Sequence, residues 1–354
     1  MEITEEHRGF AIGLTDGSRM GRISGMMKMR FWTGLLLGGL VAGGSLLGAT
    51  ADGKKKLVLI AGKPSHPPLM HEFRAGSILL EQCLKEVPGL VVERHEMGWV
   101  TDEKTFADAD AVVIYSDGGG KHPAVVDGHL ETLKALIAKG VGFGCMHYGV
   151  EVVPANGGAE FQKWLGGHYE NAFSCNPIWE PKFESFPEHA VTRGVKPFQI
   201  EDEWYFNMRF RPAFGDGITA AKDGAETFVP ILVAKPSDAT RDGPYVYPKG
   251  PYPHIQAEKG QPEAMMWTVE RGDGGRGFGF TGGHFHLNWG NDDFRKVVLN
   301  ALVWVTGAEV PEGGVASSVK AEQLQENLDP KPAPKKKVSS AIPVPRVFAR
   351  QAAE

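Results

Sequence analysis

The chain has 354 residues, of which 42% are hydrophobic and 23% are charged. This length and composition allow one large or two small globular domains with a sizeable apolar core. The formal net charge of −5 argues against a general nucleic-acid-binding protein, so we expect no nucleic-acid partner.

The first 51 residues have the pattern of an export signal. A short basic region at 28–30 precedes an apolar, glycine-rich run at 31–47, and Ala49 and Ala51 are the small residues that a signal peptidase reads. We therefore expect residues 1–51 to be an upstream extension and a signal peptide, cleaved after Ala51, and the mature protein to be exported to the periplasm or secreted. An uncleaved membrane anchor is the alternative, because the apolar run approaches the length that spans a bilayer.

Residues 52–310 are expected to form one α/β domain. Short apolar runs that end in glycine or in polar loops predict strands, and amphipathic stretches between them predict helices. The expected strands lie at 56–61, 91–96, 111–115 and 141–146, and the expected helices at 73–86 and 125–139. Such an alternation predicts a doubly wound parallel sheet.

The pattern loosens after residue 156. Further strands are expected at 176–180, 198–205, 228–234, 265–269 and 276–281, and a closing helix at 294–305. Five prolines between residues 235 and 260 predict a long irregular insertion. Residues 311–354 are rich in proline and lysine without periodicity, and we expect them to be a disordered tail.

A histidine occupies the sharpest predicted turn. The buried strand at 141–146 stops abruptly at His147, and Gly149 relieves the turn that follows. A strand-to-turn junction of this kind aims one side chain out at the carboxyl edge of the sheet, where α/β folds bind ligands. Cys145 lies inside the strand and should point elsewhere. The alternative is that His147 is a hydrogen-bonded structural histidine.

Histidines follow four of the predicted strands, and the carboxyl ends of parallel strands share one edge of a sheet. They are His66, His71, His122, His147, His284 and His286, and Glu72, Glu151 and Glu203 are expected beside them. Two chemistries fit such a group. Neutral imidazoles and a carboxylate bind Zn²⁺ or a similar ion. The same groups without a metal act as general acids and bases on a sugar.

The metal hypothesis places Zn²⁺ or another divalent ion on His147 with one or both of His284 and His286. Glu203 or Glu151 would be the carboxylate ligand or the general base, so His147, Glu151, Glu203 and His284 are the expected catalytic residues. No nucleotide cofactor is expected, because the glycines at 118–120 lack the spacing of a dinucleotide or phosphate-binding loop.

Several motifs between residues 55 and 310 together resemble the trehalose-utilisation, or ThuA-like, family. They are KLVLIAG at 56–62, HEFRAG at 71–76, YSDGGG at 115–120, HYGVE at 147–151, DEWY at 202–205 and FTGGHFH at 280–286, followed by Asn288 and Trp289. The resemblance implies a flavodoxin-like sheet similar to that of class I glutamine amidotransferases. It also implies a role in disaccharide or keto-sugar metabolism. The catalytic cysteine of the amidotransferases sits at the elbow, where this chain has His147, so we do not expect amidotransferase activity.

A small-molecule sugar is therefore the expected partner. Aromatic faces and charged groups would line a sugar-sized cleft, with the indoles of Trp179 and Trp267 nearby. The expected substrate-binding residues are His71, Glu72, Asp117, Trp204, Tyr205, Arg209, Arg241 and Trp289. A carbohydrate-binding protein without catalysis would use the same aromatics and is the alternative, and an interaction protein tethered through the basic tail is a third possibility.

Overall fold

The computed structural model describes residues 53–332. The expected signal peptide and the last part of the expected tail, residues 333–354, lie outside the described residues. Between residues 53 and 332 we find no helix with the length and apolarity that crossing a membrane requires.

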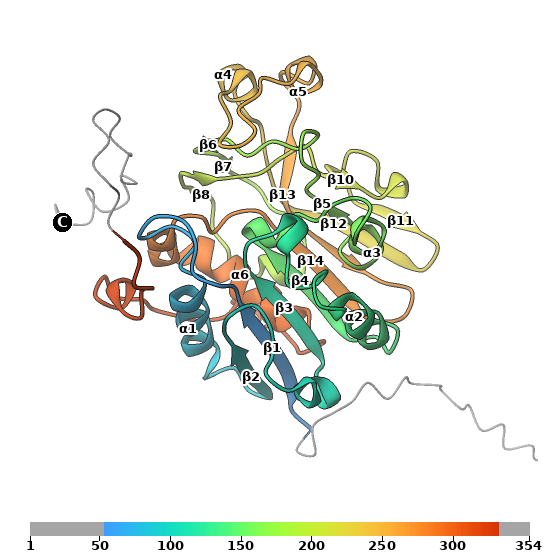
Figure 1. Ribbon diagram of the computed structural model, residues 1–354, viewed down its shortest axis with the longest axis vertical. Helices are drawn as coiled ribbons and strands as arrows, with labels where there is room; N and C mark the ends of the chain where they lie inside the picture. Colours follow the sequence, from blue (N-terminus) through green and yellow to red (C-terminus); the bar gives the residue numbers. More distant parts are fainter. Residues whose placement is uncertain (1–52, 333–354) are drawn as a thin grey trace, which may run out of the picture. The chain divides into compact units, whose positions relative to one another are not determined.

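The domain is built around one mixed sheet of eight strands (Figure 1). Its strands are β1 (Lys55–Ala61), β2 (Leu90–His95), β3 (Ala111–Tyr115), β4 (Gly142–Met146), β11 (Ala221–Asp223), β12 (Glu226–Ala234), β13 (Glu263–Glu270) and β14 (Arg276–Phe280). They lie in the order β11-β12-β13-β14-β4-β3-β1-β2. The four pairings from β14 to β2 are parallel, whereas β13, β12 and β11 are added antiparallel.

The five parallel strands have a flavodoxin-like order. Numbered along the chain within this parallel part, they run 2-1-3-4-5, which is the order of a doubly wound sheet whose ligands bind at the carboxyl edge. The expected α/β class and doubly wound sheet are thus confirmed. The antiparallel extension is the difference, since we expected a parallel sheet throughout.

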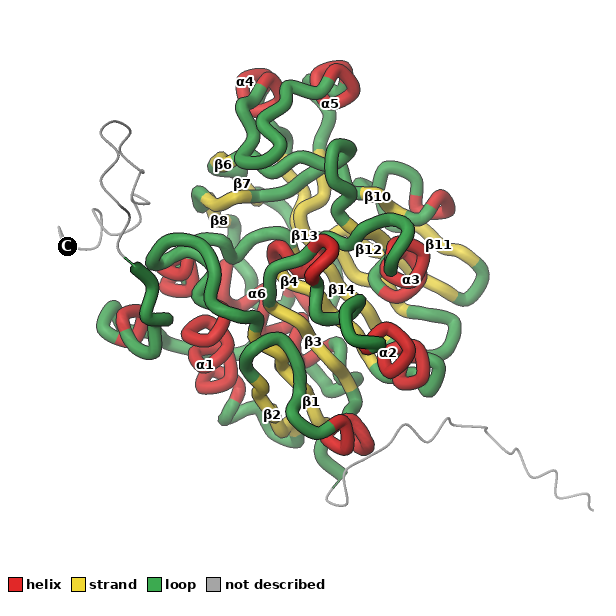
Figure 2. The backbone as a smooth tube through the Cα atoms, in the orientation of Figure 1, coloured by secondary structure: helices red, strands yellow, loops and turns green. Residues whose placement is uncertain are grey.

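Helices cover both faces of the sheet (Figure 2). One face packs against α1 (Phe73–Leu84) and α6 (Asp292–Trp304), and the other against α2 (His129–Ile137) and α3 (Gly158–Trp164). Because side chains alternate along a strand, Leu57 and Leu59 face the first pair while Val58 and Ile60 face the second. Cys145 faces the second pair and is fully buried there.

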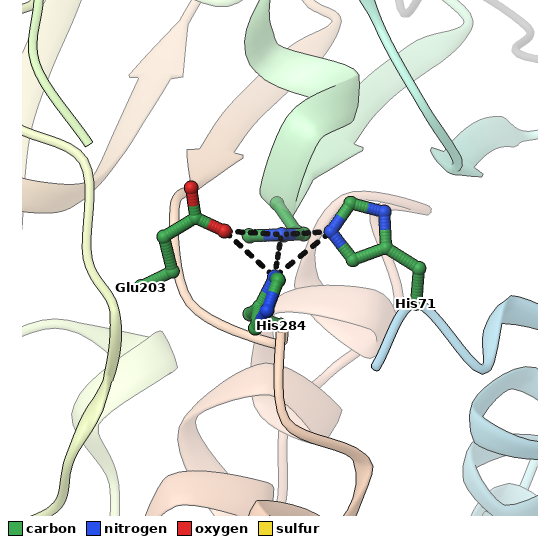
Figure 3. Close-up of side chains that lie close together, drawn as sticks. His71, Glu203 and His284 are labelled. Atoms are coloured by element: carbon green, nitrogen blue, oxygen red, sulfur yellow. Dashed lines mark hydrogen bonds and ion pairs between the residues drawn. The ribbon is translucent and has the colours of Figure 1, made fainter. Parts of the chain in front are cut away.

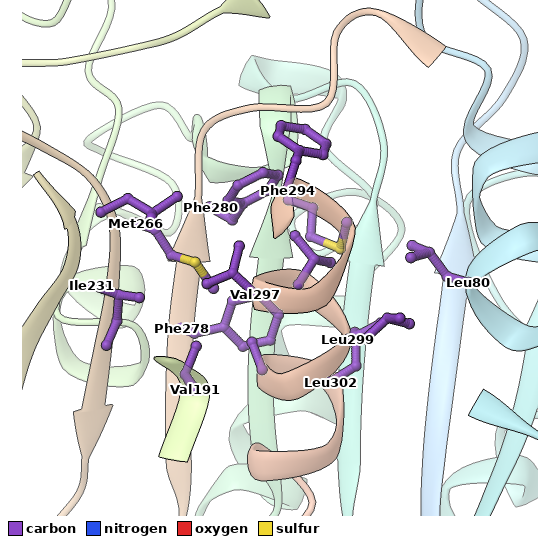
Figure 4. Close-up of a cluster of buried hydrophobic side chains, with 14 of the residues drawn as sticks. Leu80, Val191, Ile231, Met266, Phe278, Phe280, Phe294, Val297, Leu299 and Leu302 are labelled. Carbon is purple, nitrogen blue, oxygen red and sulfur yellow. The ribbon is translucent and has the colours of Figure 1, made fainter. Parts of the chain in front are cut away.

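The apolar stripe of α6 fixes the centre of the sheet. Phe294, Val297 and Leu302 lie over Phe278 and Phe280 of β14 in one buried cluster (Figure 4). Full burial of side chains of this size stabilises by about 1.5–3 kcal/mol each. The amino end of α6 is capped by Asn291, whose side chain accepts from two amides of the first turn. This packing fixes the end of β14 and the loop that follows it.

The middle of the chain is irregular, as expected. The predicted strands near 178 and 202 shorten to β6 (Ile178–Trp179) and β9 (Asp202–Glu203), which pair with each other. Two more ladders of two-residue strands pair β5 (Gly167–His168) with β10 (Arg209–Phe210) and β7 (Lys182–Phe183) with β8 (Phe198–Gln199). The proline-rich insertion holds two short helices, α4 (Asp238–Asp242) and α5 (Pro253–Ala257).

Residues 311–332 are ordered, so the expectation of a disordered tail from residue 311 onward is wrong for this part. We call these residues the C-terminal strap. Val315 and Leu324 of the strap are each 1% exposed, and the side chain of Arg295 in α6 donates to Ser317. The composition of the tail is dominated by its proline- and lysine-rich end. The few apolar side chains before that end are enough to bind the strap to the domain.

Candidate metal centre

His147 stands at a strained turn at the end of β4. Its φ of +54° lies in the left-handed region, which costs a residue other than glycine roughly 1–2 kcal/mol. The turn continues as the short 3₁₀ helix η3 (His147–Val150). The imidazole is buried, and its Nδ1 lies 3.0 Å from the carbonyl oxygen of Thr281. The sharp turn and the buried ring agree with the predicted elbow.

His71 comes from the loop after β1, and its backbone also has a positive φ, of +47°. Its amide donates to the carbonyl oxygen of His284 at 3.1 Å. Its Nδ1 lies 2.7 Å from Oδ1 of Asp117, which follows β3. The loops after three different strands are therefore tied together at one edge of the sheet.

His284 and Glu203 are held by a carboxylate that the sequence analysis did not single out. Asp202 is fully buried, and it accepts hydrogen bonds from the amides of Gly283 and His284 at 2.7 and 3.0 Å. It also accepts from Asn288 Nδ2 at 3.0 Å. Asp202 thereby fixes the loop that carries His284, and its neighbour Glu203 faces the same loop from β9.

Three imidazole nitrogens and one carboxylate oxygen converge within this edge (Figure 3). Nε2 of His71 lies 2.9 Å from Nε2 of His147 and 2.9 Å from Nδ1 of His284. The nitrogens of His147 and His284 are 3.3 Å apart, and Glu203 Oε2 is 2.7 Å from His284 Nδ1. All four ligand atoms lie within 4.8 Å of one another.

The hydrogen bonds outside the cluster decide which nitrogens carry protons. The Thr281 carbonyl and the Asp117 carboxylate are acceptors, so they place the protons of His147 and His71 on Nδ1. Each Nε2 then presents a lone pair, and these two lone pairs face each other at 2.9 Å. Burial, with the neighbouring histidines, holds the pKa of both rings well below the usual range. A cation between the nitrogens relieves this repulsion without protonating the rings.

The donor set fits Zn²⁺ or a similar divalent ion. Zn–N bonds of about 2.0–2.1 Å in a tetrahedron put ligand atoms roughly 3.3 Å apart, close to the separations between these nitrogens. The outer hydrogen bonds of His71 and His147 are those that orient metal-binding imidazoles. Asn176 plays the same part for the carboxylate, because its Nδ2 donates to Glu203 Oε1 at 2.8 Å.

The predicted ligand set needs one correction. His147 and His284 lie in the cluster, but His286 does not, and His71, which we expected to bind substrate, takes the third imidazole position. The expectation rested on the His-x-His spacing, which fits ligation on a turn and, because alternate residues share a face, also on a regular strand. In the structure β14 ends at Phe280, and His286 begins the 3₁₀ helix η6 (His286–Gly290), so strand alternation does not relate the two rings.

A cleft of about 660 Å³ adjoins the cluster at the carboxyl edge. Asp117, Tyr148 and Glu151 lie on its wall, together with the glycines at 118–120 and Trp99. Burial, with the nearby Glu203, raises the pKa of Glu151 to about 7. Glu151 is thus a carboxyl group that exchanges a proton near neutral pH, and Asp117 links the cleft to His71.

Tyr205 is the one expected aromatic residue that reaches the cluster, since its hydroxyl lies 3.3 Å from Nε2 of His147. Trp204 and Trp289 are each 0% exposed and pack in the core under α6, so they do not line a cleft. Trp179 and Trp267 are also buried. Trp179 and Trp204 belong to the irregular middle of the chain, whereas Trp267 lies on β13 and Trp289 in η6, and all four pack into the core.

Three charged residues expected to bind substrate have structural partners instead. Arg241 is buried and pairs with Glu263 at 2.7 Å. Arg209 pairs with Glu170 and stacks over a phenylalanine ring. Glu72 is buried against the C-terminal strap. The sequence could not distinguish these ion pairs from ligand-binding groups, because the partners are distant along the chain.

Two further histidines at this edge stay outside the cluster. His122 is buried and accepts from the amide of Ala124, while its Nε2 donates to the carbonyl oxygen of Gly149 at 2.7 Å, so it shapes the elbow. His66 stacks on His71 with 3.6 Å between ring centroids and remains partly exposed.

Comparison with known proteins agrees with the motifs. Residues 70–305 match the family model ThuA, described as trehalose utilisation. A crystal structure of a ThuA-like protein from Parabacteroides merdae is 16% identical with a TM-score of 0.49, and the alignment covers 73% of this chain and 92% of that one. A second, from Bacteroides uniformis, is 14% identical with a TM-score of 0.48 over 71% and 91% of the two chains. No curated protein sequence matches the chain significantly.

Proposed function

This chain belongs to the ThuA family, and we propose that it is an exported enzyme that uses a bound divalent metal and a general acid–base pair on a sugar. The proposal rests on one observation. Nε2 of His71 and Nε2 of His147 lie 2.9 Å apart, and both are close to ligand atoms of His284 and Glu203 in a buried cluster. The sugar is inferred from the family's description, trehalose utilisation, and export from the pattern of residues 1–51.

His71, His147, His284 and Glu203 would hold the metal. A divalent ion at such a site polarises a carbonyl or hydroxyl oxygen and lowers the pKa of what it binds. Asp117 keeps the proton of His71 on Nδ1, and the Thr281 carbonyl does the same for His147, so both rings stay neutral ligands. Asp202 keeps His284 in place by accepting its amide.

Glu151 is the proton-transfer group of this proposal. Its pKa of about 7 gives comparable amounts of acid and base near neutral pH, which is the condition under which a carboxyl both removes and returns a proton efficiently. It faces the cleft beside Tyr148 and Asp117, where a polyhydroxylated ring has room. In a keto-sugar the proton next to the carbonyl is the acidic one, and Glu151 as base would remove it.

A binding protein without catalysis is the alternative. That function would use exposed aromatic faces, and the indoles we expected for it are buried in the core. A buried three-histidine, one-carboxylate cluster is also more than carbohydrate binding needs. Both observations favour the enzyme.

The test combines metal analysis with turnover. Purified protein should contain one equivalent of a divalent metal, and metal-replete protein should convert 3-keto-disaccharides or related glycosides. Glu203→Gln and Glu151→Gln should both lose turnover, but only Glu203→Gln should lose metal. Glycosides that bind and survive prolonged incubation with the metal-replete protein would instead identify a binding protein.

A further inference from the structure

A buried ion pair joins the C-terminal strap to the loop after β1. Lys331 Nζ lies 3.1 Å from Glu72 Oε1, and their side chains are 4% and 1% exposed. Glu72 also accepts from the amide of Leu69 at 2.9 Å and from the amide of Asp329 at 2.9 Å. Both carboxylate oxygens are therefore used: Oε1 contacts the loop and the strap lysine, and Oε2 accepts from the strap backbone.

The same lysine holds the backbone of a cluster residue. Lys331 Nζ donates to the carbonyl oxygens of Met70 and His71, the latter at 3.1 Å. On the other side of the turn, the amide of His71 donates to His284 and the amide of His286 donates to Leu69. The peptide that carries the His71 ring is thus held on one side by the loop after β14 and on the other by the strap.

The chemistry of the pair points to positioning rather than to stability. Burying a lysine and a glutamate removes both from water, and apolar side chains of similar size would often serve stability as well or better. An ammonium group supplies something that an apolar side chain does not, namely directed hydrogen bonds to two carbonyl oxygens at once. The turn at His71 needs such support because its φ is positive.

We propose that the C-terminal strap is a working part of the metal centre, with Lys331 as the residue that positions His71 through the carbonyls of its turn. This inference rests on the proposed function, since it assigns His71 as a ligand. It also gives a role to Glu72, which anchors the lysine.

Lys331→Met removes the ammonium and keeps the length of the side chain, and Lys320→Met is its matched control. Lys320 is an exposed lysine of the same strap. The affinity for Zn²⁺, measured by competition with a chelator, should fall about 10-fold to 100-fold in Lys331→Met, the usual effect of losing a group that supports a ligand. It should not change in Lys320→Met. The absorption spectrum of the Co²⁺-loaded protein should change in Lys331→Met alone.

The double variant Glu72→Gln/Lys331→Met separates positioning from loss of folding, because it leaves no unpaired buried charge. It should fold with the thermal stability of the wild type or close to it, yet retain the weak affinity for Zn²⁺. Wild-type affinity in either the single or the double variant would overturn the proposal.

Hydrogen exchange of the His71 amide tests the positioning role of Lys331 without any bound metal. In metal-free protein, the amide of His71 should be protected in the wild type and in Lys320→Met, and it should exchange faster in Lys331→Met. If the wild type binds no Zn²⁺ but this difference is present, the proposed function fails while the positioning of the turn stands. Equal exchange in all three proteins would overturn the positioning itself.

Discussion

Nε2 of His71 lies 2.9 Å from Nε2 of His147, and both atoms present lone pairs because the other nitrogen of each ring donates to an acceptor. Two such atoms repel each other unless a cation lies near both. The two residues are 76 positions apart in the sequence, and we assign the metal centre from this contact.

The first prediction distinguishes the observed cluster from the set expected from sequence. His71→Ala should lower the bound metal to well below one equivalent, because it removes a ligand at the centre of the cluster. His286→Leu should retain the metal, because that ring lies outside the cluster. Elemental analysis of both purified variants checks this, and the reverse pattern would return His286 to the ligand set.

Asp202→Ala should destabilise the fold and weaken metal binding together. The substitution leaves the amides of Gly283 and His284 and the side chain of Asn288 without their acceptor. Because these are buried hydrogen bonds to a carboxylate, the free energy of unfolding should fall by about 3 kcal/mol or more. Urea denaturation measures it.

Asp216→Ala is the control for that experiment. Asp216 accepts a local amide in the same way, but it is exposed to solvent. Its loss should change the free energy of unfolding by about 0.5 kcal/mol or less. Equal effects of the two substitutions would mean that Asp202 is no more than a surface acceptor.

Glu151 should make stability depend on pH in a definite direction. Its pKa rises from the usual 4.5 to about 7 on folding, so between these values the folded protein holds the proton more tightly than the unfolded chain. The contribution of this group to stability therefore falls as the pH rises through that window. Glu151→Gln removes the effect, so the variant should gain thermal stability relative to the wild type between about pH 5 and about pH 8. A difference in melting temperature that does not vary with pH would contradict the raised pKa.

Two glycines in the turn after β3 test how closely the backbone packs next to the cleft. A Cβ on Gly118 would lie 2.1 Å from the carbonyl oxygen of Tyr148 and 2.7 Å from that of Glu151. Gly118→Ala should therefore lower the free energy of unfolding by about 1–3 kcal/mol. On Gly120 the nearest atom is Val153 Cγ2 at 3.8 Å, an ordinary contact, so Gly120→Ala should leave stability unchanged or slightly higher. Similar losses in both variants would show that the close approach at Gly118 is not what the turn requires.

Sequence patterns predicted the edge of the sheet but not the exact set of ligands. The exits of β4 and β14 share that edge because parallel strands must align, and this brought His147 and His284 together in advance. The orientation of His71 depends on a positive φ and on hydrogen bonds to a loop 213 residues away, which no local pattern encodes. His286 lies outside the cluster because it begins η6, beyond the loop that carries His284.

The tryptophans show a second limit. A tryptophan in the sequence does not show whether its indole lines a cleft or is buried in the core. Its position is set by the tertiary fold. Trp204 packs against Phe280 and Phe294 beneath α6, a contact between segments about 80 residues apart that periodicity does not reveal.

The antiparallel extension of the sheet has a consequence for self-association. Without β11, β12 and β13, the apolar strand β14 would be an edge strand with unpaired amides and carbonyls, open to pairing with another molecule. The extension moves that edge to β11, which is three residues long and carries the exposed side chains of Lys222 and Asp223. The opposite edge, β2, carries the charged side chains of Glu93 and Arg94. Short or charged edges of this kind discourage edge-to-edge aggregation.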